Sequence, residues 1–173
     1  MKTFLTAAAI ALSLATVPAL AQTPPTSNAG VQMPMPAANW LFVQVADSVT
    51  VDGNKLVLKG VAPQTLMFSD RPERMTGDTP TPSFVKYWTA GRESFQKDPP
   101  NATLSVTVDG KAQVSVIELT NPELSGDTLT YTINVLSAEK PASGTSASLF
   151  IDWWYAGPGH CWRGPLGALH CGY

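Results

Sequence analysis

Residues 128–135 read TLTYTINV, in which large apolar side chains alternate with threonine and asparagine. Because successive side chains of a strand point to opposite faces, Leu129, Tyr131 and Ile133 are expected to share one buried face. A strand with one buried and one solvated face is typical of antiparallel sheets. The stretch therefore predicts an antiparallel, mostly β domain.

The same alternation recurs around two turn sequences, Asp52-Gly53-Asn54 and Asp109-Gly110. Such sequences adopt positive φ angles at little cost, so each predicts a β-hairpin. In the second hairpin Val114 and Val116 continue the apolar alternation, with a change of face after them. Residues 121–127 are rich in turn formers and predict a loop.

Only one stretch has the pattern of a helix. Ser83 is a suitable N-cap, Phe84, Tyr87 and Trp88 fall at i, i+3 and i+4, and Gly91 is a suitable stop. A helix of about two turns is stable only when it packs against something else. We therefore expect its aromatic side chains to plug an edge of the β core.

Further short strands are expected at residues 65–69 and 147–151. About seven or eight short strands with Gly, Pro, Asn and Asp turns indicate an all-β protein with a minor helical part. The predicted architecture is an antiparallel β-sandwich, immunoglobulin-like, with one short helical insertion. A small β-barrel is the alternative topology.

The N-terminal region of this 173-residue chain predicts export. Residues 1–21 combine a basic start, a short apolar run and an Ala-Leu-Ala cleavage pattern, so they predict a signal peptide. Residues 22–39 are Pro-rich and predict a flexible leader, residues 40–152 the β domain, and residues 153–173 a tail. We expect a periplasmic or secreted protein, with no membrane span. The net charge of −2, without a basic stripe, argues against nucleic acid as a partner.

Residues 68–74 read FSDRPER. On this motif and on the stretches GDTLTY and SLFID, residues 56–152 resemble an uncharacterised family of exported bacterial proteins. The resemblance implies export from a bacterial cell, and it carries no catalytic residues or cofactor with it.

Within that motif, Asp70, Arg71, Glu73 and Arg74 surround a proline directly after a predicted strand. Arginine forks pair well with carboxylates, so one interpretation is a self-satisfied network of ion pairs. The other is a binding site, in which an arginine stays free for an anionic ligand or a partner's carboxylate. A hydrolase using Asp70 and Glu73 as acid and base is a further alternative, although neighbouring arginines would keep both carboxylates ionised.

The two cysteines of the chain, Cys161 and Cys171, lie in the tail. In an exported protein, two cysteines most simply form a disulfide, which we predict here. The alternative is a metal site with His160, Cys161, His170 and Cys171 as ligands. Adjacent ligands fit one tetrahedral ion poorly, because spacings of two to four residues are usual. We therefore expect neither a metal nor another cofactor.

The tail also carries a concentration of aromatic side chains. They form either a flat platform for a protein or carbohydrate ligand of the cell envelope, or a lid on the β core. The residues expected to contribute to such a platform are Trp153, Trp154, Tyr155, Trp162 and Arg163.

No serine lies in a nucleophile elbow and no glycine-rich phosphate loop opens a helix, so the sequence favours a protein without enzymatic activity. The predicted function is an exported, soluble binding or scaffolding module. The competing class is an enzyme or metal protein, for which Asp70, Glu73, His160 and His170 would have to meet in one cleft.

Overall fold

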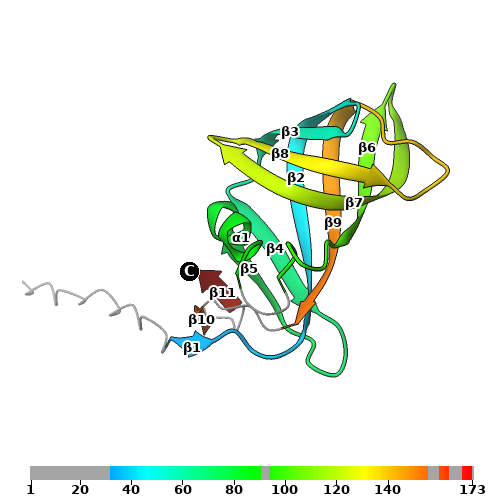
Figure 1. Ribbon diagram of the computed structural model, residues 1–173. Coiled ribbons are helices and arrows are strands. Elements are labelled where there is room, and N and C mark those ends of the chain that lie inside the picture. Colours follow the sequence, from blue (N-terminus) through cyan, green and yellow to red (C-terminus); the bar gives the residue numbers. More distant parts are fainter. Residues whose placement is uncertain (1–31, 91–93, 156–159, 164–168, 173) are drawn as a thin grey trace, which may run out of the picture.

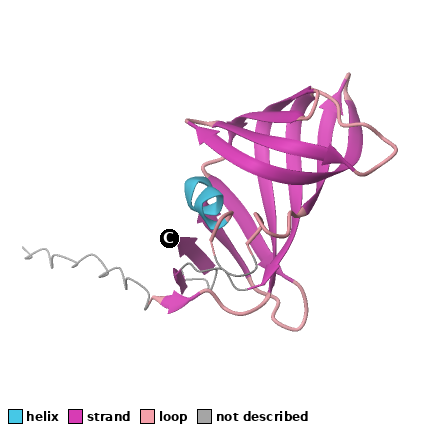
Figure 2. Cartoon of the chain, viewed as in Figure 1, coloured by secondary structure: helices cyan, strands magenta, loops and turns pink. Residues whose placement is uncertain are grey.

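The computed structural model describes residues 32–90, 94–155, 160–163 and 169–172. Strands dominate it, and one short helix interrupts them (Figure 2). This confirms the predicted all-β class with a minor helical part. The predicted signal peptide and residues 22–31 of the leader lie outside the described residues. The elements, in chain order, are β1 (Met33–Pro34), β2 (Asn39–Asp52), β3 (Lys55–Val61), β4 (Gln64–Ser69), β5 (Thr76–Pro80), α1 (Thr81–Tyr87), β6 (Asn101–Val108), β7 (Lys111–Ser125), β8 (Thr128–Val135), β9 (Gly144–Tyr155), β10 (His160–Arg163) and β11 (Leu169–Gly172).

Six strands close on themselves in a ring. Antiparallel pairings run from β2 through β3, β8, β7, β6 and β9 and return to β2. Figure 1 shows this ring in the upper part of the molecule. A closed sheet has no unpaired edge along its circumference. Of the two topologies predicted from the sequence, these pairings correspond to the small barrel.

The long strand β2 belongs to the ring and also to a lower extension of the sheet. Its residues 46–52 pair with β3, whereas its residues 40–43 pair with β4. Between β3 and β4 the chain passes through Ala62 and Pro63, and proline cannot donate to a ladder. From β4 the sheet continues through β5, β11 and β10 to β1. The extension therefore grows out of one side of the ring (Figure 1).

Alternating side chains fill the inside of the ring. Leu129, Tyr131 and Ile133 of β8 are buried, as the sequence predicted. The turns at Gly53 and Gly110, both with positive φ, close the two predicted hairpins. The other buried strand residues that join this core are Trp40, Phe42, Ala46, Val49, Leu56, Leu58, Val61, Met67, Ala102, Leu104, Val106, Ile117, Leu119, Ala147, Leu149 and Ile151.

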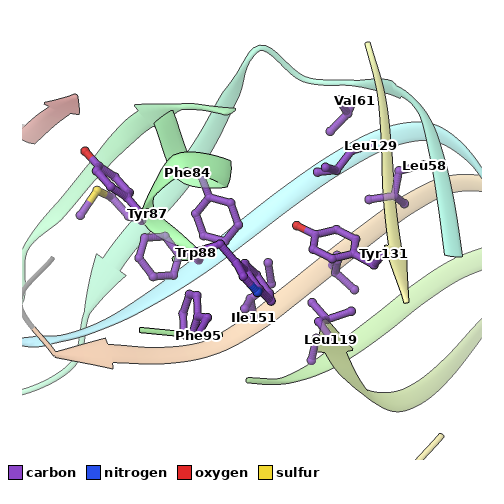
Figure 3. Close-up of a cluster of buried hydrophobic side chains, with 14 of the residues drawn as sticks. Leu58, Val61, Phe84, Tyr87, Trp88, Phe95, Leu119, Leu129, Tyr131 and Ile151 are labelled. Atoms are coloured by element: carbon purple, nitrogen blue, oxygen red, sulfur yellow. The ribbon is translucent and has the colours of Figure 1, made fainter. Parts of the chain in front are cut away.

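The aromatic side chains of α1 and the segment after it plug the lower end of the ring. Phe84 packs edge-on against Phe42 of β2, with ring centroids 5.0 Å apart. Trp88 lies 5.0 Å from Phe95 and 5.6 Å from Tyr131, so the plug reaches the interior of the ring (Figure 3). All of these side chains are buried. The predicted role of the helix as a plug is confirmed.

The predicted start of this helix is wrong. The N-cap is Pro80, no side chain caps the first turn, and a proline occupies the second helical position. Ser83 therefore lies inside the helix, and the helix ends at Tyr87, before Gly91, which lies outside the described residues. No helix in the described ranges has the length and hydropathy that crossing a bilayer requires.

Two segments differ from their predicted conformation. Residues 121–127 were expected in a loop, but β7 continues to Ser125, with a register shift after Thr120 and a positive φ at Asn121. Asparagine tolerates that conformation, so the strand accommodates a bulge and the chain turns later, at Gly126. The last part of the predicted flexible leader also packs: β1 pairs with β10, and Met35 and Ala38 are buried in the core.

A chain of hydrogen bonds crosses the core. The Tyr131 hydroxyl donates to Gln44 Oε1 at 2.9 Å, and Gln44 Nε2 donates to Thr65 Oγ1 at 3.3 Å. The Thr81 hydroxyl donates to the Ala62 carbonyl at 2.8 Å, so the Thr65 hydroxyl must donate to Thr81 Oγ1 at 3.1 Å. Each group in this series donates to the next, from the Tyr131 hydroxyl to the Ala62 carbonyl. It links β8 and β2 of the ring to β4 and α1.

Candidate functional site

The tail contains a disulfide, as predicted. Cys161 and Cys171 are bonded with an S–S distance of 2.09 Å and a Cα–Cα distance of 4.1 Å. They face each other directly in the antiparallel pair β10–β11. Both are buried, so the bond lies in the core of the extension.

The tail is part of the sheet. Leu169 and His170 of β11 pair in parallel with Gly77 and Asp78 of β5. A Cβ added at Gly77 would collide with the Leu169 carbonyl, so only glycine allows this close approach. Leu169 is fully buried, and His170 Nδ1 lies 3.0 Å from Asp78 Oδ1. These contacts hold the disulfide hairpin against the extension.

The predicted alternative metal site is not assembled. The disulfide occupies both sulfur atoms, and thiolates rather than disulfides ligate metals. The His170 ring lies against Asp78 instead, and the side chain of His160 lies outside the described residues. Among the described side chains, no three His, Cys, Asp or Glu groups converge as metal ligands.

The residues predicted for the aromatic platform are described by their backbone alone. The backbone of β9 runs through residues 153–155, and the backbone of β10 includes residues 162–163. In this stretch Trp154 is the register partner of Trp40. The side chains of Trp153, Trp154, Tyr155, Trp162 and Arg163 lie outside the described residues.

The turn between β4 and β5 carries the four charged residues of the FSDRPER motif, which we call the charged turn: Asp70, Arg71, Glu73 and Arg74. All four are exposed, and the described residues form no ion pair with any of them. The turn is closed instead by backbone bonds, from the Arg74 N–H to the Asp70 carbonyl at 3.0 Å and from the Ser69 N–H to the Met75 carbonyl at 2.9 Å. The expected self-satisfied ion-pair network is therefore wrong.

Because Arg71 has no partner in this turn, Arg71→Ala is expected to leave the melting temperature unchanged. Ser69→Ala is the matched control. The Ser69 hydroxyl accepts the Met75 N–H at 2.9 Å, and its loss should cost about 1 kcal/mol. Differential scanning fluorimetry of both variants measures the difference. A melting temperature that falls more for Arg71→Ala than for Ser69→Ala would instead support the interpretation of the charged turn as an ion-pair network.

The groups proposed for a hydrolase are not brought together. Asp70 and Glu73 lie on the exposed charged turn, and His170 lies on β11 against Asp78. A general acid needs a desolvated carboxyl group near its substrate, which an exposed turn does not provide. The described side chains thus give the enzymatic alternative no support.

Among the described residues, Tyr131 is the titratable group whose pKa is shifted most clearly by its surroundings. Its complete burial raises the pKa of the hydroxyl far above the ordinary value. Strongly shifted groups often mark active sites, but only where a substrate can reach them. Tyr131 lies inside the core, so its hydroxyl serves as a structural donor.

The sequence analysis missed an apolar surface on the outside of the sheet. We call it the apolar band, and it consists of Val45, Leu66, Phe68, Val114, Val116 and Phe150. Their exposed fractions are 41%, 51%, 37%, 50%, 36% and 47%. Val114 and Val116 were expected to continue the buried alternation, but Ser115, Ile117 and Leu119 face the core instead. The expected change of face does not occur.

The strand register places three members of the apolar band, Leu66, Phe150 and Val116, in one row across the sheet. Leu66 of β4 is opposite Val43 of β2, Val43 is opposite Phe150 of β9, Phe150 is opposite Thr103 of β6, and Thr103 is opposite Val116 of β7. Opposed residues in antiparallel strands share a face. One row of side chains therefore crosses five neighbouring strands.

Phe68 extends the apolar band toward the charged turn, which begins two residues later at Asp70. A hollow of about 210 Å³ opens in this part of the surface, lined by side chains that include Leu41, Phe68, Phe150 and Asp152. Phe68 thus belongs to the apolar band, lines the hollow and lies two residues before the charged turn.

A second hollow, of about 500 Å³, lies where β3 continues into β4 and α1 begins. Pro63, Pro80 and Pro82 supply much of its apolar wall, and the polar members of its lining are Gln64, Thr81 and Asp127. A lining with a single carboxylate offers no acid–base pair for catalysis.

The apolar band could have been suspected from β2. In residues 40–45 every side chain except Gln44 is apolar, on both faces of the strand. A strand with one solvated face would instead alternate apolar with polar side chains. The pattern indicates that both faces of the strand are either buried or exposed as apolar surface. It does not indicate which outward side chains lie next to one another.

The chain matches no known protein family, no characterised protein and no solved structure.

Proposed function

We propose that this chain is an exported binding or scaffolding module of the bacterial cell envelope, which contacts a folded protein surface through the apolar band. The observation that carries the proposal is the row of outward side chains from Leu66 to Val116 across five strands, which is apolar except at Thr103. Contiguous exposed apolar patches of several hundred Å² on a soluble protein are often interaction sites.

A protein fits this surface better than a carbohydrate. Sugars are held by aromatic faces combined with a dense set of hydrogen-bonding groups, whereas the apolar band is largely aliphatic. Interfaces between proteins have an apolar centre and a polar rim. The apolar band supplies such a centre, and the charged turn lies at its margin.

The disulfide and the N-terminal sequence support export. Disulfides persist in oxidising compartments such as the periplasm, and Cys161–Cys171 is buried in the folded chain. Residues 1–21 have the organisation of a signal peptide.

A photo-crosslinking amino acid placed at Val114 or at Val45 tests the proposal in cells of the producing organism. Each position should give the same protein adduct, recovered in the envelope fraction. The adduct should disappear when Phe150→Asp is added, because a charge in the middle of an apolar contact must be desolvated without a partner. Thr50, exposed on β2 outside the apolar band, is the control position and should give no such adduct.

Adducts of equal yield at Thr50 and Val114, or adducts that persist with Phe150→Asp, would remove the apolar band as the contact surface. Recovery of the chain from the cytoplasm, with residues 1–21 still attached, would remove the exported part of the proposal. The circular dichroism spectrum of Phe150→Asp confirms that the variant is folded, which is expected because the side chain is half exposed.

A further inference from the structure

We infer that the protein that covers the apolar band is a second copy of this chain, in a two-fold contact that also pairs the two charged turns. The inference rests on the proposed function, since it names the partner of the same surface. A two-fold contact uses the same patch on both copies, so the patch must be complementary to itself. The apolar band and the charged turn both meet that requirement.

The charged turn is self-complementary in charge. It carries two carboxylates and two arginines, all exposed and without an ion pair among the described residues. Facing its own copy, each Arg71 or Arg74 finds a carboxylate from Asp70 or Glu73. Arginine and carboxylate pair in a bidentate geometry, which fixes orientation as well as adding attraction. A partner of uniform charge would leave two of the four groups repelled.

The area of the apolar band suits the centre of such an interface. At roughly 100–200 Å² for a fully exposed apolar side chain, its six members present on the order of 400 Å². A standard interface buries about 800 Å² on each partner, of which the apolar centre is only a part. The charged turn and the neighbouring polar strand residues supply the rim.

The hollow beside Phe68 and Phe150 adds shape complementarity to the proposed two-fold contact. Its volume is about 210 Å³. An apolar cavity of about 150 Å³ is enough to hold a benzene ring. Because Phe68 and Phe150 are exposed at its rim, a two-fold contact brings a phenyl ring of each copy to the hollow of the other. Two rings thus become buried by one symmetric contact.

Two charge-swap variants of the mature chain test the inference. The first, R71E with R74E, makes the turn wholly acidic, and the second, D70R with E73R, makes it wholly basic. Sedimentation velocity at about 10–100 μM should show a dimer for the unmodified chain and a Kd weakened at least about tenfold for each variant alone. An equimolar mixture of the two variants should recover the dimer, because the turns are then opposite in charge.

Phe150→Asp should also give a monomer, whereas Thr50→Asp, outside the apolar band, should leave the dimer intact. A monomeric unmodified chain, or two charge-swap variants that dimerise alone as well as they do when mixed, would overturn the inference. If the chain is monomeric while the crosslinker at Val114 gives an adduct with a different protein, the proposed function stands and the second copy is wrong. If it is monomeric and no adduct forms at Val45 or Val114, both fail.

Discussion

A chain truncated after Asp152 is expected to lose its cooperative thermal transition, or to melt far below the complete chain and aggregate. The truncation removes the end of β9 together with β10 and β11. It takes Cys161, Leu169 and Cys171 out of the buried core and leaves β5 without its neighbour β11. Apolar surface that these residues cover would be exposed to water. Of the two roles predicted for the tail, platform and lid, the contacts of the described tail residues favour the lid.

Thermal denaturation followed by circular dichroism measures this effect. The control is a complete chain with Cys161→Ser and Cys171→Ser, which loses the crosslink and keeps the strands. Loss of a disulfide that closes a loop of this size should lower the free energy of unfolding by about 3 kcal/mol or less. The control should therefore melt at a lower temperature than the unmodified chain, but still cooperatively. A truncated chain that melts cooperatively, within a few degrees of the control, would show that the tail is dispensable for folding.

The second large effect is expected from Phe84→Ala, which should lower the free energy of unfolding by about 3–5 kcal/mol. The Phe84 ring is fully buried and contacts Phe42, Trp88 and Phe95, with centroid distances of 5.0, 6.0 and 6.2 Å. Its removal leaves a cavity at the plug of the ring. Such a loss is a large fraction of the stability of a typical domain, about 5–15 kcal/mol.

Urea denaturation of Phe84→Ala and of Lys86→Ala gives the comparison. Lys86 lies on the exposed side of the same helix, so its substitution should change stability little and controls for helix propensity. A loss of less than about 1 kcal/mol for Phe84→Ala would mean that the helix is not a plug and that the ring is stable without it.

The parts of the fold that follow from local chemistry were predictable. Gly53 and Gly110 have the positive φ that their turn sequences predict. The alternation of Leu129 and Tyr131 correctly predicts the buried face of β8. The strand β5 was not predicted, because its sequence TGDTP contains no large apolar side chain. It is a strand because β4 and β11 bond to it on either side, which no local pattern encodes.

The candidate site divides in the same way. The charged turn was recognisable from its residues, but the absence of ion pairs among Asp70, Arg71, Glu73 and Arg74 depends on how the side chains point. The apolar band was not predictable, because Leu66, Phe150 and Val116 come from distant segments and become neighbours only through the strand register. A one-residue shift of one strand would turn its members into the core.

The pairing of β2 with β9 also decides when the chain is able to fold. Val43 and Phe150 are register partners although most of the described chain lies between them, so the ring has no closure until β9 has been synthesised. Folding that depends on such distant contacts is slow, because the loop between them must be ordered first. A nascent chain therefore stays without a barrel during most of its synthesis. For a protein that we propose is exported, that delay leaves an unfolded chain for the translocation machinery to move.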